Sequence, residues 1–549
     1  MKNHDHILIA TALCCFAIFF SCDNQTDKCV SCMSTPGNPY LPLWEHVPDG
    51  EPYVFEDPDN PGKFRAYIFG SHDVLRTEYC GYDIIAWSAS VDSLNVWRCE
   101  GPVLIVDKNA KGEKFYEEDR GDILYAPDVA MKVAPDGKKT YYLYPNDQAM
   151  GRNSLVAISD RPDGPYEICN WSKENPDQTK GLLTFDPAVL VDDDGRVYGY
   201  WGFDHSYAAE MDPDDMASLK PGTEIIDGMI PGRKEDDIFR FYEASSIRKI
   251  EDKYVFIYSR WTKDGDFGLP NTNYTLAYAY SDKPLGPWTY GGTIIDARGR
   301  EINEKGEIIA SATISGNTHG SICKIKDQWY VFYHRQTGTN EFARQPMVAP
   351  IEVKVEAGPG GKVYISEGEY TSEGFALNGL DPTERHSAGI ACWYTGPKVA
   401  VHAWPEKTYF GSYVAAGHGT DSNFEAPYDI RNNTNPVINN NDGSIVGYKY
   451  FNFTKMCGKK DPKLNLRLIP EGVDGTIQVM LDRPWESQGG TLLGSAEIKA
   501  KWASRSRELR IDLPGLEKYS GKHAIYFKFF SDTKDKSICT LEDFVFSVK

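Results

Sequence analysis

The sequence lacks any clear membrane-spanning segment near its start, although the first residues include an apolar run. The apolar run of residues 7–20 is shorter than the ~20 residues that a membrane helix needs. It follows Lys2 and ends just before Cys22, a pattern typical of a bacterial lipoprotein signal. We therefore predict a lipoprotein signal over residues 1–22, lipidation at Cys22 and attachment to the cell envelope. A plain secretory signal is the alternative. Residues 23–39 would form a tether.

Positively charged residues are scarce relative to negatively charged ones. The 549 residues carry 59 Lys and Arg against 79 Asp and Glu, a formal net charge of −20. Such a surface repels nucleic acid and anionic membranes. Nucleic acid is therefore excluded as a partner, and a neutral oligo- or polysaccharide is favoured.

The twelve cysteines show no zinc-binding pattern. Cys29 and Cys32 form one C-x-x-C pair, but structural zinc needs four ligands and no matching pair follows. A disulfide in the tether or free thiols is the expected state.

No long amphipathic helix is evident between residues 45 and 350, and 13% of the residues are aromatic, which favours short strands. One unit recurs five times: a polar residue beside small or apolar ones, a turn, then an aromatic strand. The distance from the polar residue to the aromatic strand is 11 to 16 residues. The five polar residues are Glu51, Asp128, Asp186, Glu243 and His319.

These repeats predict a five-bladed β-propeller over residues 40–352. The innermost strands of a propeller line its channel, so the recurring polar residues would surround one mouth. Carboxylates crowded there repel one another, which raises some pKa values and leaves others low. Glycoside hydrolysis needs that split, with one protonated acid and one ionised base.

The ordered motifs resemble glycoside hydrolase family 43. They are Asp49-Gly50-Glu51-Pro52, Ala126-Pro127-Asp128, Glu243-Ala244-Ser245 and Thr318-His319-Gly320-Ser321. The resemblance implies a propeller, inversion at the anomeric carbon and exo-action on furanosides or xylosides. It suggests an arabinofuranosidase, galactofuranosidase or xylosidase that acts on a plant or microbial polysaccharide, with no required cofactor.

The resemblance also assigns roles. Glu243 matches the general acid and Asp128 the third carboxylate, which orients the acid and tunes its pKa. His319 matches an axial histidine that, in many members, approaches a calcium ion or a water in the channel. The family base is usually Asp before Pro, whereas this chain has Glu51 there. We predict Glu51 as the base, with Asp49 as the alternative.

Other candidate residues are less specific. Asp186 would bind ligand or serve only the structure of the ring, and Arg335 would contact sugar hydroxyls or pair with a ring carboxylate. Three tryptophans are candidate sugar platforms or core residues, namely Trp87, Trp201 and Trp261.

The blade pattern ends near residue 352. Residues 353–396 are expected to connect the domains, and alternating strands over residues 397–549 predict a β-sandwich. The order of these strands resembles a family 6 carbohydrate-binding module. A fructan-hydrolase type of propeller is disfavoured because its Asn-Asp-Pro-Asn-Gly and Arg-Asp-Pro motifs are missing. A non-catalytic glycan-binding lipoprotein is the alternative from another functional class.

Overall fold

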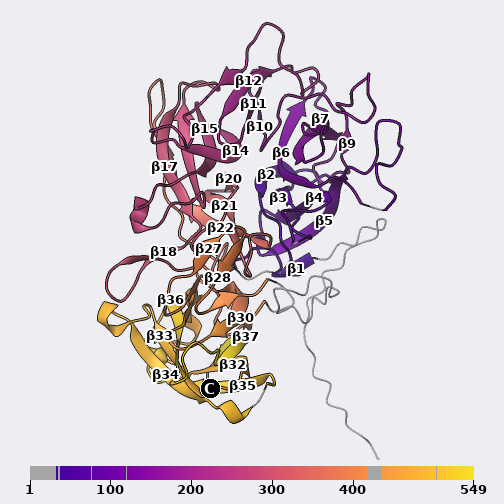
Figure 1. The fold of residues 1–549 in the computed structure, drawn as a ribbon. Helices are drawn as coiled ribbons and strands as arrows, with labels where there is room; N and C mark the ends of the chain where they lie inside the picture. Colours follow the sequence, from indigo (N-terminus) through magenta and orange to yellow (C-terminus); the bar gives the residue numbers. More distant parts are fainter. Residues whose placement is uncertain (1–31, 35–36, 76, 119, 417–434, 503) are drawn as a thin grey trace, which may run out of the picture.

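The computed structural model describes residues 32–34, 37–75, 77–118, 120–416, 435–502 and 504–549. Within these ranges the chain is built from strands and short 3-10 turns, without an α-helix. It forms an N-terminal propeller and a C-terminal sandwich (Figure 1). A search of the same ranges finds no helix with the length and apolarity to cross a membrane. The predicted signal and Cys22 lie outside the described residues, as does Cys29.

Five antiparallel sheets of the described residues are the blades. The first has the order β1 (Cys32–Ser34), β5 (Val96–Ile105), β4 (Asp83–Ser90), β3 (Phe64–Ser71), β2 (Glu51–Glu56). The second contains β6 (Leu124–Val133), β7 (Lys139–Asp147), β8 (Ala157–Ser159), β9 (Glu167–Ile168). The third contains β10 (Ala188–Val191), β11 (Val197–Trp201), β12 (Tyr207–Met211), β13 (Ile226–Asp227). The fourth contains β14 (Phe241–Ile250), β15 (Lys253–Arg260), β16 (Thr275–Ser281), β17 (Thr289–Asp296). The fifth contains β20 (Ser321–Ile325), β21 (Gln328–Gln336), β22 (Arg344–Ile351).

The innermost strands close into a ring. Strand β2 contacts β6 and β20, β10 contacts β6 and β14, and β14 contacts β20. Each of these strands begins one of the five predicted units, so the five-bladed prediction is confirmed. Strand β1 pairs with β5 at the edge of the first blade. The segment predicted as a tether therefore already contributes a blade strand.

The C-terminal domain is a sandwich of two sheets. One has the order β29 (Tyr413–Val414), β30 (Val437–Asn440), β37 (Cys539–Ser547), β32 (Lys463–Pro470), β35 (Arg507–Asp512), with β25 (His386–Ser387) also on β37. The other has the order β26 (Trp393–Thr395), β31 (Ile445–Asn452), β36 (Lys522–Phe530), β33 (Gly475–Leu481), β34 (Thr491–Ile498). Because β25 and β26 lie before residue 397, the sandwich begins inside the segment predicted as a connection.

Shorter elements join these parts. Three two-stranded hairpins are present in the described ranges: β18 (Arg300–Ile302) with β19 (Ile308–Ala310), β23 (Val353–Val355) with β24 (Val363–Ile365), and β27 (Val401–Ala403) with β28 (Glu406–Thr408). The 3-10 turns are Asp266–Gly268, Ala388–Ile390, Phe453–Lys455, Glu486–Gln488, Ala500–Trp502 and Leu516–Lys518.

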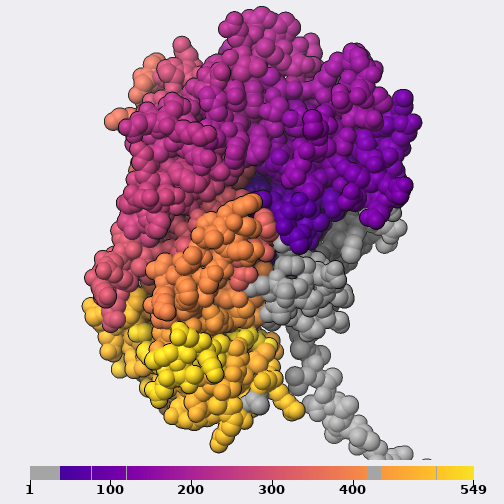
Figure 2. All heavy atoms as spheres, viewed as in Figure 1, coloured from indigo at the N-terminus to yellow at the C-terminus, as the bar shows by residue number. Residues whose placement is uncertain are grey.

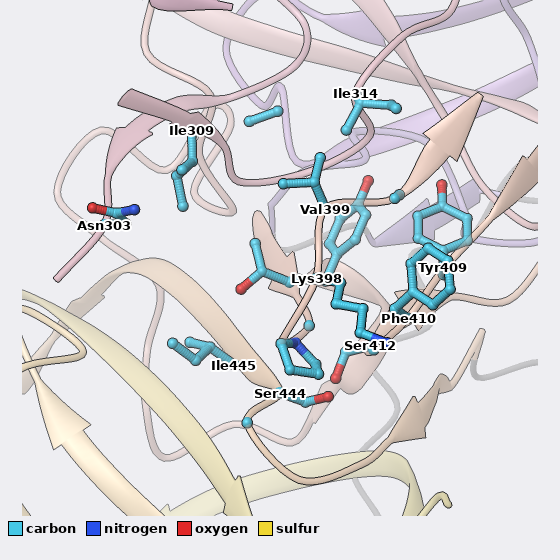
Figure 3. Close-up of a pocket in the computed structure, with 18 of the residues that line it drawn as sticks. Asn303, Ile309, Ile314, Lys398, Val399, Tyr409, Phe410, Ser412, Ser444 and Ile445 are labelled. Atoms are coloured by element: carbon cyan, nitrogen blue, oxygen red, sulfur yellow. The ribbon is translucent and has the colours of Figure 1, made fainter. Parts of the chain in front are cut away.

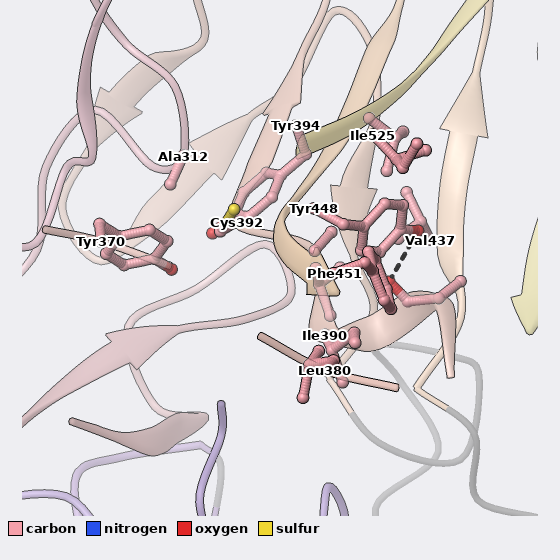
Figure 4. Close-up of a cluster of buried hydrophobic side chains, with 14 of the residues drawn as sticks. Ala312, Tyr370, Leu380, Ile390, Cys392, Tyr394, Val437, Tyr448, Phe451 and Ile525 are labelled. Atoms are coloured by element: carbon pink, nitrogen blue, oxygen red, sulfur yellow. Dashed lines mark hydrogen bonds between the residues drawn. The ribbon is translucent and has the colours of Figure 1, made fainter. Parts of the chain in front are cut away.

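One apolar core runs through both domains. It includes Ile257 and Val331 of the fourth and fifth blades together with Leu466 and Phe527 of the sandwich. Figure 4 shows the junction, where Tyr370 and Ala312 lie on the side of Tyr394 that faces the propeller, and Tyr448 and Phe451 lie on its other side, in the sandwich. Since burial of apolar area stabilises by about 25 cal/mol per Å², this shared core fixes the sandwich against the propeller.

Candidate active site

A pocket of about 610 Å³ opens at one mouth of the propeller. Side chains from several blades line it, including Asp49, Asp186, Glu243, His319 and Arg344. It thus brings together three of the carboxylates considered from the sequence and the predicted histidine. Glu51, Asp128 and Arg335 are not among its lining residues.

A local backbone feature explains which carboxylates reach the pocket. Asp49, Ala126, Asp186 and Ala244 stand at equivalent entries to the first four blades, and all have left-handed backbone angles, with φ of 57°, 45°, 43° and 65°. This conformation is uncommon for residues other than Gly, although Asp is tolerated there. In β14 and β6 the register shifts around the same point. The chain therefore kinks as it enters each blade, and the kink lies at the pocket.

Glu51 and Asp128 lie one step deeper than the pocket. Glu51 follows the left-handed residue Asp49 by two positions, and Asp128 follows Ala126 in the same way. Because a strand rises ~6.6 Å over two residues, both carboxylates lie further along the channel than the pocket-lining residues. Both carboxylates are buried, with 1% and 2% of the residue exposed. The geometry does not support the prediction of Glu51 as base and Asp128 as third carboxylate. If Gly50 is aligned with Pro127 and Pro187 of the next two blades, Asp49 takes the position of Asp186 in the repeat, and Asp49 becomes the candidate base.

The deeper layer is a buried ion-pair network. Arg248 Nη2 donates to Glu51 Oε1 over 2.5 Å, and Ser246 Oγ donates to the same oxygen over 2.9 Å. The Tyr53 hydroxyl donates to Asp128 Oδ1 over 2.6 Å. Burial and the Glu51 charge raise the pKa of Asp128 to about 7. These contacts hold the centre of the propeller together beneath the site.

Asp49 is held ionised. Arg344 Nη1 donates to its Oδ1 over 3.0 Å and Ser71 Oγ donates to its Oδ2 over 2.6 Å. Burial alone raises the pKa of Asp49, but the Arg344 charge and, to a lesser extent, the Ser71 hydrogen bond act against it, and the pKa stays below its usual value. Arg344 also makes a two-pronged pair with Asp73, at 2.9 and 2.8 Å. A buried, ionised carboxylate facing a pocket can accept a proton from water.

Glu243 is the opposite case. Burial, followed by the charges of Asp186 and Asp49, raises its pKa well above the usual value. Burial also raises the pKa of Asp186 to about 6, with Asp49 adding to the effect and His319 opposing it. Asp186 Oδ2 accepts from the backbone N–H of Ala244 over 2.8 Å. The residue after Glu243 is thereby tied to Asp186, which fixes the direction of the acid.

Two histidines support this arrangement. His319 Nδ1 lies 3.7 Å from Asp186 Oδ2. His334 Nδ1 accepts from the Asp49 backbone N–H over 3.3 Å and its Nε2 faces the Asn317 carbonyl at 2.9 Å, so its proton is on Nε2. Burial and Arg344 lower the pKa of His334 to about 3, which keeps it neutral.

The calcium prediction is not supported by a ligand cluster. No group of three or more His, Cys, Asp or Glu side chains in the described ranges is arranged to hold a metal ion. Two of the carboxylates considered from the sequence are paired with guanidinium groups, Glu51 with Arg248 and Asp49 with Arg344. A calcium ion near His319 stays a prediction.

Arg335 has a different role from the predicted one. It is fully buried, and its guanidinium donates to Gln345 Oε1 and to the carbonyls of Ala391, at 2.8 Å, and Gly389. These contacts join the fifth blade to the sandwich, so Arg335 is a structural residue of the domain junction. The pocket arginine is Arg344, which no repeat in the sequence singles out.

Aromatic side chains form a belt along one wall of the pocket. Ring contacts run in series from Tyr125 to Phe185, Phe203, Tyr242 and Trp261, with centroids 5.0 to 6.1 Å apart. Trp261 is thus a pocket residue, and its use as a sugar platform stays a prediction.

The other two candidate tryptophans, Trp87 and Trp201, are core residues with 0% and 5% exposure. The segment between β15 and β16 supplies Asn271, Thr272 and Asn273 to the pocket wall, whereas no described residue of 107–122, between β5 and β6, lines the pocket.

A second pocket, of about 740 Å³, lies between the domains. Figure 3 shows Ile309 and Ile314 of the propeller on one side, with Val399, Tyr409, Phe410 and Ile445 of the C-terminal part around it. Glu304 is the one acidic residue among its described lining residues. It lacks the paired carboxylates of a hydrolytic site, so the chemistry belongs to the smaller pocket.

Comparisons with known proteins identify the family of this chain. The profile of glycosyl hydrolases family 43 matches residues 78–357, just over half of the chain. A xylosidase/arabinosidase of Thermoclostridium stercorarium is 31% identical over 92% of this chain and 98% of its own length. An arabinoxylan arabinofuranohydrolase of Paenibacillus polymyxa is 27% identical over 90% of this chain and 72% of its own. Among solved structures, a family 43 arabinoxylan arabinofuranohydrolase of Bacillus subtilis, in complex with cellotetraose, has a TM-score of 0.43 at 19% identity and covers 94% of this chain and 99% of its own. The match to the family profile and the near full-length similarity to the first relative show that this chain is a glycosidase that belongs to glycosyl hydrolases family 43.

Proposed function

We propose that the protein is an exo-acting, inverting glycosidase that releases a terminal arabinofuranose or xylose from an arabinoxylan-type chain. The names of its relatives motivate the sugar class. The observation that carries the mechanism is the opposite displacement of two carboxyl pKa values in one pocket, lowered for Asp49 and raised for Glu243. Such a split assigns base and acid.

In this mechanism Glu243 donates its proton to the glycosidic oxygen as the bond to the anomeric carbon breaks. Asp49 takes a proton from a water that attacks the same carbon from the opposite face, and the released sugar has the inverted configuration. Asp186 keeps the pKa of Glu243 high through its charge and orients the acid through the Ala244 N–H. We expect the Asp49 and Glu243 carboxyl groups to be separated by ~6.5–9.5 Å, the room that an intervening water needs.

The non-catalytic alternative is disfavoured. Glu51 in place of the usual Asp would favour it, but Asp49 supplies a carboxylate to the pocket. Exo-action is favoured because a pocket with buried carboxylates at its base accepts a chain end more readily than the middle of a chain.

The test is a panel of arabinofuranosides and xylosides with NMR detection of the first-formed anomer. We expect one of the two sugars to be released with inversion and single terminal units to accumulate from oligosaccharides. Retention of configuration, or early shortening of a polymer by internal cleavage, would contradict the mechanism.

Two further proposals concern the rest of the chain. We propose a lipid anchor at Cys22 in the cell envelope, because an apolar run ends there and polar residues follow. Cys22→Ala should move the protein from the membrane to the soluble fraction; an unchanged distribution would argue against it.

Glycan binding by the sandwich is the second of these. The pocket between the domains offers the aromatic rings of Tyr409, Phe410 and Trp485, which suit the apolar face of a sugar. Trp485→Ala should weaken retention on immobilised arabinoxylan, and unaltered retention would count against a glycan site there.

A further inference from the structure

A hairpin that follows the propeller in the sequence returns to the active-site pocket. Strands β27 and β28 pair Val401 with Thr408 and Ala403 with Glu406. Figure 1 places them between the two domains, and Figure 2 shows the orange segment around residue 400 seated against the indigo first blade. Its side chains His402 and Trp404 line the pocket that contains Asp49 and Glu243.

Backbone contacts hold the hairpin on the fifth blade. Glu406 forms an isolated bridge with Asn340, and the Lys407 N–H donates to the Thr339 carbonyl over 2.7 Å. The Lys407 ammonium is buried, where it donates to the Asn340 carbonyl over 3.2 Å and to Gln336. These contacts fix the position of the hairpin, and therefore of its tip, at the pocket.

Side-chain contacts connect the hairpin to the first blade as well. His402 Nε2 lies 2.6 Å from Glu341 Oε1, and the Tyr79 hydroxyl donates to Glu341 Oε2 over 2.5 Å. Trp404 lies close enough to the Tyr79 hydroxyl to lower its pKa, against the larger upward effect of burial. The polar edge of the indole therefore faces Tyr79, which leaves its face available.

Trp404 is nevertheless 67% exposed. An indole in that state leaves a large apolar face in water. The acidic residues at the base are buried, with Asp49 at 5% and Asp186 at 4% exposure. In an exo-acting pocket the terminal sugar occupies the base, so the next unit of the chain stands at the rim, where Trp404 lies.

We propose that Trp404 is the platform for the sugar on the leaving-group side, so that the segment after the propeller selects which oligosaccharide is cleaved. The proposal rests on the proposed exo-glycosidase function. The face of the indole would cover the apolar face of that sugar, while His402 and Glu341, which also line the pocket, provide polar contacts.

The experiment uses the full chain and two substrates that differ only in the leaving group. One is an oligosaccharide with the accepted terminal sugar; the other is the glycosyl fluoride of that sugar, which has no leaving-group ring. For Trp404→Ala we expect the ratio of the two kcat/KM values, oligosaccharide over fluoride, to fall about 10-fold, the size of a typical aromatic contact. Trp404→Phe should restore most of the ratio.

Tyr364→Ala is the matched control, because Tyr364 is 53% exposed on β24 and is not a pocket-lining residue. It should leave the ratio at the wild-type value. A wild-type ratio in Trp404→Ala, or an equal loss on both substrates, would overturn the proposal.

A binding measurement separates this proposal from the proposed function. In the Glu243→Gln background, calorimetry with an arabinoxylan oligosaccharide should give a Kd that Trp404→Ala raises about 10-fold. If the wild type failed to turn over any glycoside, the proposed function would fail while this titration still tested the platform. An unchanged Kd would refute the platform.

Discussion

Asp49→Asn tests which carboxylate is the base. The amide keeps the shape of the side chain but cannot take the proton from water. A well-placed base contributes about 10²–10⁴-fold to the rate, which corresponds to ~2.7–5.5 kcal/mol of the activation barrier. We expect kcat to fall by that factor on the fluoride of the accepted sugar. Stability should fall by less than the full cost of breaking a buried pair, because Arg344 loses Asp49 but keeps its two bonds to Asp73.

Glu51→Gln should behave in the opposite way. Glu51 is 1% exposed and is paired with Arg248 over 2.5 Å, and removal of one partner of a buried pair costs ~3–5 kcal/mol. The urea midpoint should therefore fall, while kcat of the folded fraction stays within a few-fold of the wild type. A Glu51→Gln protein of normal stability with kcat lowered ~10²-fold or more, beside an active Asp49→Asn, would refute the reasoning.

Three further outcomes follow from the same contacts. Asp186→Asn removes a charge that raises the pKa of Glu243, so the alkaline limb of the pH–kcat/KM profile should move to lower pH; a shift to higher pH would contradict the assignment. Arg344→Met removes the cation that lowers the pKa of Asp49, so the acidic limb should move to higher pH, with a loss of ~3–5 kcal/mol in stability from the unpaired carboxylates; an unmoved limb would exclude this role. Arg335→Met leaves buried carbonyls without a donor, at ~1–3 kcal/mol each, so the urea midpoint should fall with kcat for the fluoride preserved; loss of kcat at normal stability would return Arg335 to the site.

The repeats in the sequence predicted the propeller because each blade repeats the same short strands with the same aromatic alternation. They did not predict the depth of each carboxylate. Residues two apart on a strand share a face, so Asp49 and Glu51 both satisfy the pattern, and the choice depends on the left-handed kink. Arg344 and Trp404 could not be found either, because each reaches the pocket through tertiary contacts: Arg344 with Asp73, and the β27–β28 hairpin with the fifth blade.

The left-handed residues at the blade entries also account for the length of each acidic side chain. At Asp49 and Asp186 the functional residue itself occupies the strained conformation, where a short side chain that can bond its own backbone is the best tolerated non-glycine choice. In the fourth blade the strain falls on Ala244, so Glu243 is released from that restriction and a longer acid fits. The division between aspartate and glutamate in this pocket is therefore set by the backbone at each entry as much as by the proton each group carries.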